Sequence, residues 1–120
     1  MPTIPRIAVL NDLESLGYSI PYLSSRQAPL FKEGEKTRGT AAVLSLGTGL
    51  GVSAVTKEGI VLPSEGGHMD FAPEDERQER LLRFLRRQYG HVSYERVLSG
   101  RGLANIDAAF EMCIRDRYNL

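Results

Sequence analysis

The sequence predicts a mixed α/β fold, and three observations support this. A short apolar run at residues 6–10 is typical of a buried strand. Residues 41–62 carry apolar stretches separated by glycine-containing turns, which predicts an antiparallel meander. After Pro73, leucines recur at helical spacing and predict an amphipathic helix. The 120 residues are enough for a small domain with its own core.

The first predicted strand ends in two polar residues, Asn11 and Asp12. In open α/β sheets, ligands bind at the carboxyl ends of strands, so both side chains are candidate site residues. The alternative is that Asn11 or Asp12 caps the following helix, and the two roles can coexist. That helix is expected over residues 13–20, weakened by Gly17 and ended or kinked by Pro21.

The middle of the chain is expected to form a connection followed by three strands. Residues 24–40 are polar and predict a connecting segment, with an edge strand near residues 28–31. A buried strand is expected at residues 41–46, a half-buried strand at residues 52–56 and a third strand at residues 60–62.

A glycine-rich loop separates the first two of these strands. Gly47, Gly49 and Gly51 fall within five residues, which is more glycine than a hairpin turn needs. Such a loop can direct consecutive backbone N–H groups at an anion such as phosphate. It is not a Walker A loop, because no Gly-Lys-Ser/Thr follows, and it is not a dinucleotide fingerprint, because no helix follows. The alternative is a plain glycine-rich hairpin.

The segment at residues 62–73 combines polar chemistry with a close backbone approach. Glu65 and His68 flank the pair Gly66-Gly67. Glycine has no Cβ, so the backbone can pass close to a neighbour. Glu65 supplies an acceptor and His68 a donor or acceptor, so the segment is a candidate binding site.

The second half of the chain is expected to be helical. Acidic residues at positions 74–76 suit the N-terminus of the first helix, and Gly90 ends it. A further helix is expected from Ser93, a natural N-cap. Glu95 then lies in its first turn, pointing back towards the preceding loop; the alternative is an acid that only complements the helix dipole.

The end of the chain gives weaker patterns. Residues 100–102 contain two glycines and are expected to break the chain before another helix at residues 103–110. Residues 111–120 show no clear pattern.

Composition excludes several classes of protein. Lys+Arg and Asp+Glu both number 15, and this balance argues against a nucleic-acid partner. No apolar run approaches the roughly 18 residues of a membrane span, and the N-terminus lacks signal-peptide organisation. The single cysteine, Cys113, excludes an internal disulfide and fits a reducing cytosol, so a cytoplasmic protein is expected.

No metal site is expected. His68, His91 and Cys113 fit no zinc-ligand spacing. Asp70 is instead interpreted as a structural partner of His68, and His91 as a helix-entry residue.

Four motifs in this order resemble the bacterial glucokinase family of sugar kinases. They are VLND at residues 9–12, SLGTGLG at 45–51, LPSEGGHMDFAP at 62–73 and GHVSYERVLSGRGL at 90–103. The resemblance covers residues 7–110 and implies part of an actin-like ATPase (ribonuclease H-like) fold.

The resemblance also implies a domain organisation. Residues 1–22 correspond to the end of the small α/β domain with the catalytic aspartate, and residues 23–110 to the first part of the large domain. Residues 111–120 depart from the family pattern, and their Met-Cys-Ile-Arg-Asp-Arg string suggests an artefactual tail. Family members carry a further N-terminal phosphate motif and an adenosine-binding half, so an internal fragment is expected that does not phosphorylate glucose by itself.

By this resemblance, the family activity is ATP-dependent phosphorylation of glucose at its 6-hydroxyl. Asp12 is then the catalytic base, and Mg²⁺ arrives bound to ATP. The implied glucose ligands are Asn11, Glu65, His68 and Glu95. The implied ATP-binding residues are Gly47, Thr48, Gly49 and Gly51.

Two alternatives to a glucose kinase stay open at this point. Arg101 replaces a family proline, and Ser45 and Ser64 replace family glycines. The two serines add hydroxyls near the implied phosphate and sugar sites, so another hexose, such as mannose or an amino sugar, is one alternative. The other is a catalytically silent, sugar-binding regulatory protein of the same fold. The resemblance to the glucokinase family also implies that full-length members are candidates for homodimers.

Overall fold

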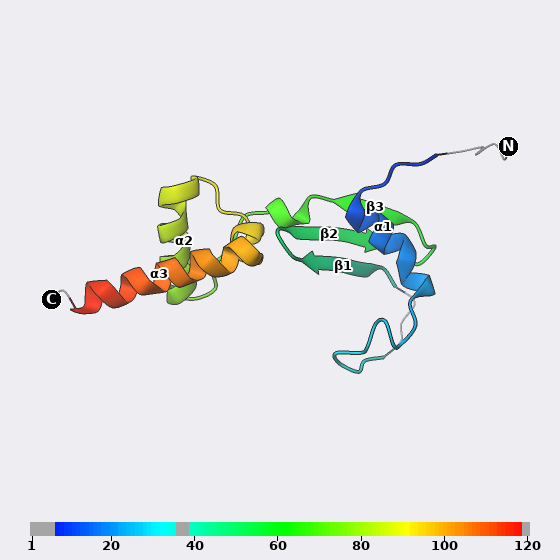
Figure 1. The fold of residues 1–120 in the computed structure, drawn as a ribbon, viewed down its shortest axis with the longest axis horizontal. Helices are drawn as coiled ribbons and strands as arrows, with labels where there is room; N and C mark the ends of the chain where they lie inside the picture. Colours follow the sequence, from blue (N-terminus) through cyan, green and yellow to red (C-terminus); the bar gives the residue numbers. More distant parts are fainter. Residues whose placement is uncertain (1–6, 36–38, 119–120) are drawn as a thin grey trace. The chain divides into compact units, whose positions relative to one another are not determined.

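The computed structural model describes residues 7–35 and 39–118, with side chains described as far as Met112. The chain consists of two compact units (Figure 1). Each unit has its own hydrophobic core. Unit 1 comprises Met1–Val43 and Val52–Ser64, and unit 2 comprises Leu44–Gly51 and Glu65–Leu120.

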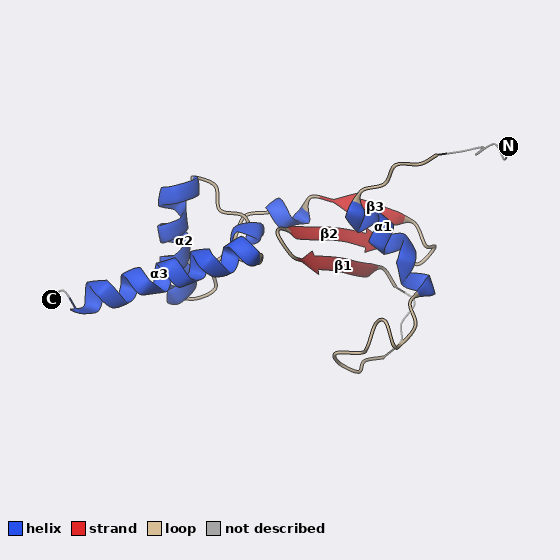
Figure 2. Cartoon of the chain, in the orientation of Figure 1, coloured by secondary structure: helices blue, strands red, loops and turns tan. Residues whose placement is uncertain are grey.

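The predicted meander is present as a three-stranded sheet, drawn in red in Figure 2. Its strands are β1 (Ala41–Leu46), β2 (Leu50–Val55) and β3 (Val61–Ser64), in the spatial order β1-β2-β3. β2 and β3 pair antiparallel, with Val55 opposite Val61. β2 begins earlier than expected, because the last two residues of the glycine-rich loop already have strand geometry.

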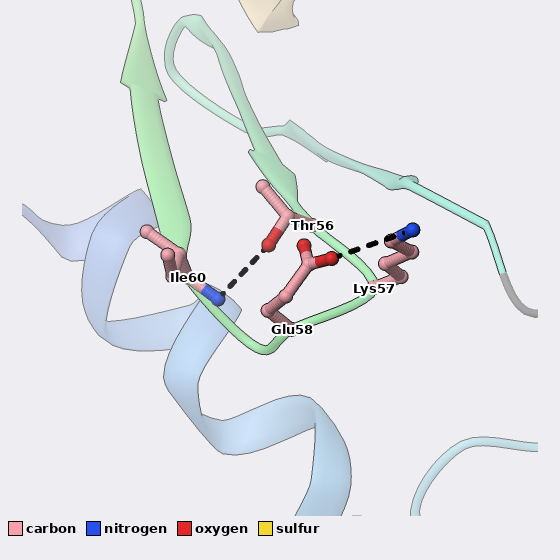
Figure 3. A network of polar contacts seen from close by, with 4 residues as sticks. All are labelled: Thr56, Lys57, Glu58 and Ile60. Atoms are coloured by element: carbon pink, nitrogen blue, oxygen red, sulfur yellow. Dashed lines mark hydrogen bonds and ion pairs between the residues drawn. The ribbon is translucent and has the colours of Figure 1, made fainter.

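A tight turn joins β2 to β3 (Figure 3). The N–H of Thr56 donates to the carbonyl of Ile60 at 2.9 Å, and the N–H of Ile60 donates to Oγ1 of Thr56 at 3.3 Å. Gly59 has a φ of 83°, in the left-handed region that favours glycine. Lys57 and Glu58 form an exposed ion pair at 3.6 Å, which contributes little to stability.

The expected first helix is α1 (Asp12–Ser19), which packs against β3. Pro21 follows in the short 3-10 helix η1 (Ile20–Tyr22), where α1 has already ended. Gly17 is buried, and a Cβ added there would lie 2.7 Å from Cγ1 of Val61. Glycine therefore lets the helix approach the strand closely. The core of unit 1 consists of Leu13, Val43, Val55 and Val61.

Two predicted strands of the N-terminal part are wrong. Residues 7–10 form no strand, and Ile7 and Val9 are 84% and 94% exposed; Arg6 lies outside the described residues. Residues 28–31 also form no strand, and the large apolar side chains of Leu30 and Phe31 are exposed. A strand needs a neighbour to pair its N–H and C=O groups, and no strand in the described part of the chain pairs with either segment.

β1 is a strand as predicted, but the expectation that it is buried is wrong. Only Val43 is buried, whereas Leu44 and Leu46 are exposed. The physical reason is its place in the sheet, because β1 is an outer strand with a neighbour on one side only.

The strong helix after Pro73 is α2 (Glu76–Tyr89), as the sequence predicted. Asp75 is the N-cap and accepts the N–H of Gln78 at 2.8 Å, and Gly90 ends the helix with a φ of 68°. The core of unit 2 contains the predicted leucine stripe and consists of Phe71, Leu81, Leu82, Leu85, Val92, Val97 and Ala109.

The helix expected from Ser93 is wrong, since the structure has only a single 3-10 turn, η3 (Tyr94–Arg96). Ser93 pairs with Asp70 in an isolated antiparallel β-bridge. The N–H of Tyr94 donates to the carbonyl of Met69 at 2.9 Å. These strand-like contacts hold the backbone before η3 extended, and Val97 ends the turn.

The expected break at residues 100–102 is also wrong, because these residues begin the helix α3 (Gly100–Tyr118). Ser99 explains the start, since its Oγ accepts the N–H of Gly102 at 3.0 Å, as an N-cap does. A Cβ at Gly102 would overlap the carbonyl of Val97, so glycine suits this first turn. The helix continues beyond the predicted end at residue 110 and includes most of the tail.

Candidate functional site

The glycine-rich loop is held in place by three contacts within unit 2. The carbonyl of Gly47 accepts the N–H of Gly100 at 2.8 Å. The N–H of Leu50 donates to Oε2 of Glu95 at 3.1 Å. Gly67 lies directly against the carbonyl of Leu50. Segments that are far apart in the sequence therefore converge on this loop.

The close backbone approach predicted for the Gly66-Gly67 pair is present at Gly67, where the neighbouring group is the backbone of Leu50. A Cβ at Gly67 would overlap the carbonyl oxygen of Leu50, so any larger residue would push the two segments apart. Gly67 is buried in this contact. It lies in the 3-10 turn η2 (Gly66–His68), which packs against η3.

The loop contains two consecutive N–H groups that no other described residue binds. Gly47 donates its N–H to the carbonyl of Gly49 at 3.0 Å. Within the described residues, the N–H groups of Thr48 and Gly49 have no hydrogen-bond partner. A Cβ at Gly49 would stand 2.5 Å from Oε2 of Glu95, so this glycine makes room for the carboxylate. Gly51, the last predicted loop residue, lies inside β2.

Glu65 and His68 lie together at the two ends of η2. Oε2 of Glu65 is 3.7 Å from Nε2 of His68, a distance for an ion pair but too long for a hydrogen bond. The two side chains are 88% and 61% exposed, so both can meet a ligand from solvent. Because η2 packs against η3, unit 2 brings both residues near the turn that carries Glu95.

Asp70 does not pair with His68, so the expected partner is wrong. Its Oδ1 lies 2.6 Å from Nε2 of His91. The β-bridge between Asp70 and Ser93 explains this choice, because it places the Asp70 side chain beside the segment that contains His91. His91 is also not a helix-entry residue, since no α-helix begins there.

Asn11 and Asp12 belong to unit 1, whereas the other candidate residues belong to unit 2. Asn11 is the N-cap of α1, and its Oδ1 accepts the N–H of Leu13 at 2.9 Å. Asp12 is the first residue of α1, and its Oδ1 accepts the same N–H at 2.8 Å. Both side chains are exposed. The capping alternative is confirmed for Asn11, and its Nδ2 remains a donor.

Sequence reasoning missed Arg101, which lines a cavity of about 470 Å³ with Thr48, Gly49 and Gly100. A signal for this position is present in the sequence. Ser99 is a natural N-cap, so the two glycines that follow it can begin a helix rather than break the chain.

The described residues contain no group of three histidine, cysteine, aspartate or glutamate side chains that could hold a metal ion. None of the helices described is both long enough and apolar enough to cross a bilayer.

Comparison with known proteins gives a consistent result. A family model described as glucokinase matches residues 2–116. The glucokinase of Photorhabdus laumondii subsp. laumondii is 42% identical over 107 residues, which cover 86% of this chain and 33% of that protein. The glucokinase of Salmonella arizonae is 45% identical over 104 residues, which cover 83% of this chain and 32% of that protein. The chain thus spans about one third of the length of these relatives.

Solved structures show the same partial fold. The glucokinase from an Antarctic psychrotroph matches with a TM-score of 0.76 and 36% identity, over 83% of this chain and 32% of that one. The glucokinase from Balamuthia mandrillaris, solved in complex with glucose, matches with a TM-score of 0.64 and 23% identity, over 92% of this chain and 35% of that one. At 23% identity the second likeness shows the fold alone. The expected fold, part of that of a glucokinase, is therefore confirmed.

Proposed function

The chain belongs to the glucokinase family, and on that premise we propose that it supplies the sugar-binding segments and one phosphate loop of an ATP-dependent glucose kinase. The observation that carries this proposal is the bond between Glu95 and the N–H of Leu50. It joins a proposed sugar ligand to the proposed phosphate loop. A transfer reaction needs its acceptor and donor held side by side, and this bond supports such positioning.

The candidate sugar ligands have the chemistry that glucose requires. Glucose is uncharged and presents a ring of hydroxyls, which carboxylates bind through charge-assisted hydrogen bonds. Glu65 and His68 are exposed beside each other. Within the described chain, Oε1 of Glu95 has no partner, so it is free to accept a hydroxyl while Oε2 holds the loop. Asn11 adds a donor through its Nδ2.

The phosphate loop suits an anionic donor. The N–H groups of Thr48 and Gly49 have no partner among the described residues, which supports a role in binding phosphate oxygens, and the exposed Thr48 hydroxyl adds a further donor. Mg²⁺ bound to ATP would neutralise charge on the phosphates. These residues fit a nucleotide phosphate.

Asp12 is the catalytic base in this proposal. Its carboxylate takes the proton of the glucose 6-hydroxyl as that oxygen bonds to the γ-phosphorus of ATP and ADP leaves. Asp12 is exposed at the start of α1, so its carboxylate is accessible to a substrate. We propose the cytoplasm as the compartment, because a single cysteine suits a reducing environment.

Calorimetric titration of the purified chain with glucose tests the sugar-binding part of this proposal. Saturable binding is expected, and Glu95→Gln should weaken it because the charge is lost. Glu79→Gln, which removes an exposed carboxylate from α2, is the matched control and should leave the affinity unchanged. Tighter binding of mannose than of glucose would point to another hexose, and no saturable binding of either sugar would refute the proposal.

A further inference from the structure

A cavity in unit 2 joins the glycine-rich loop to the start of α3. It has a volume of about 470 Å³ and is lined by Thr48, Gly49, Gly100 and Arg101. The hydrogen bond from the N–H of Gly100 to the carbonyl of Gly47 holds its two walls together. Arg101 brings the only charged side chain among these lining residues.

Arg101 occupies a position that helix stability disfavours. It is the second residue of α3, where the positive end of the helix dipole opposes a cation, and the first turn contains no acidic residue. Its side chain is exposed, and among the described residues no carboxylate forms an ion pair with it. An anion in the cavity would give this guanidinium the partner that the described residues do not provide.

The opposite wall offers complementary donors. The N–H groups of Thr48 and Gly49 are without partners in the described part of the chain, whereas the N–H of Leu50 is already taken by Glu95. Two neutral donors and one guanidinium suit a ligand with several negatively charged oxygens along its length. A polyphosphate has this chemistry, and arginine can bind two phosphate oxygens at once.

We propose that Arg101 is a specificity-determining residue that binds the polyphosphate chain of the nucleotide in this cavity, opposite the N–H groups of Thr48 and Gly49. The proposal deepens and rests on the proposed function. It assigns the preference for a triphosphate to a residue outside the glycine-rich loop.

Titration of the purified 120-residue chain with inorganic triphosphate, ATP and adenosine tests the proposal. Arg101→Ala should raise the Kd for both triphosphates about fivefold, and the loss should shrink in high salt. Arg101→Lys should fall between the wild type and Arg101→Ala, because lysine keeps the charge but not the two-point geometry. Arg83→Ala, which removes an exposed arginine from α2, should leave both Kd values unchanged.

A thermal readout separates binding from folding. Arg101→Ala should raise the Tm of the free chain, because it removes a cation from the N-terminus of α3. Equal triphosphate affinity in the wild type and Arg101→Ala would overturn the proposal, as would an equal loss in Arg83→Ala or binding of ATP no tighter than that of adenosine.

Glucose titrations on the same variants keep the two proposals distinguishable. Arg101→Ala should bind glucose as the wild type does. Loss of glucose binding in every variant would count against the proposed function. Equal triphosphate affinity in the wild type and Arg101→Ala would count against this inference alone.

Discussion

Oε2 of Glu95 accepts the backbone N–H of Leu50 at 3.1 Å, although the two residues are 45 positions apart. The bond ties η3 to the first residue of β2. Gly49 beside it has no room for a side chain, because a Cβ there would stand 2.5 Å from the same oxygen. The glycine-rich loop and the Glu95 segment, which look independent in the sequence, are therefore one structural element.

Glu95→Ala should lower the free energy of unfolding by about 1 kcal/mol, because the N–H of Leu50 then loses its partner. Glu95→Gln should cost much less, since the amide oxygen of glutamine can still accept this bond. Urea unfolding of the purified variants measures both effects. Equal stability of Glu95→Ala and the wild type would show that the bond does not hold the loop.

Gly67→Ala should destabilise the chain by about 2 kcal/mol, because its Cβ would overlap the carbonyl of Leu50. Gly47→Ala is the matched control, since a Cβ there meets nothing within 4 Å and the residue does not have a positive φ. Thermal unfolding of the two variants compares them directly. If both variants melt at the same temperature, the tight packing at Gly67 is not present in solution.

Gly17→Ala should destabilise unit 1 by about 1 kcal/mol, even though alanine favours a helix by a similar amount. The added Cβ would lie 2.7 Å from Cγ1 of Val61. In a Val61→Ala background this conflict disappears, so Gly17→Ala should become stabilising. A double-mutant cycle by urea unfolding measures the coupling, and simple additivity of the two changes would contradict the packing of α1 on β3.

Substitutions at Asn11 can separate its capping role from its proposed sugar role. Asn11→Ala should cost about 1 kcal/mol of stability, because α1 loses its N-cap. Asn11→Ser should keep the stability, since serine caps nearly as well, but should weaken glucose binding because the Nδ2 donor is gone. Unfolding and glucose titration are both needed. Unchanged glucose affinity in Asn11→Ser would leave Asn11 as a cap alone.

Elements with local signals could be predicted from the sequence. Asp75 and Gly90 mark both ends of α2, and Gly59 marks the turn between β2 and β3, because caps and turns depend on neighbouring residues only. The strands expected at residues 6–10 and near residues 28–31 failed because a strand depends on a partner that the segment itself does not reveal.

The candidate site residues also divide into those with a local signal in the sequence and contacts that depend on the fold. Residue types and spacing identified Glu65 and His68 as candidates, and the resemblance to glucokinases added Glu95. Local sequence could not show that Glu95 binds the N–H of Leu50, because that contact depends on the fold. The cavity beside Arg101 was missed because two glycines were interpreted as a break, whereas packing against the carbonyl of Val97 requires glycine inside the first turn of α3.

The most direct test of the central claim is a glucose phosphorylation assay on a chimera. The 107 residues that match the Photorhabdus laumondii glucokinase would replace the corresponding third of that protein. The chimera should convert glucose and ATP to glucose 6-phosphate, and Asp12→Asn in the chimera should lower kcat about 1000-fold. A folded chimera that binds glucose without forming product, or an Asp12→Asn chimera with full kcat, would contradict the account.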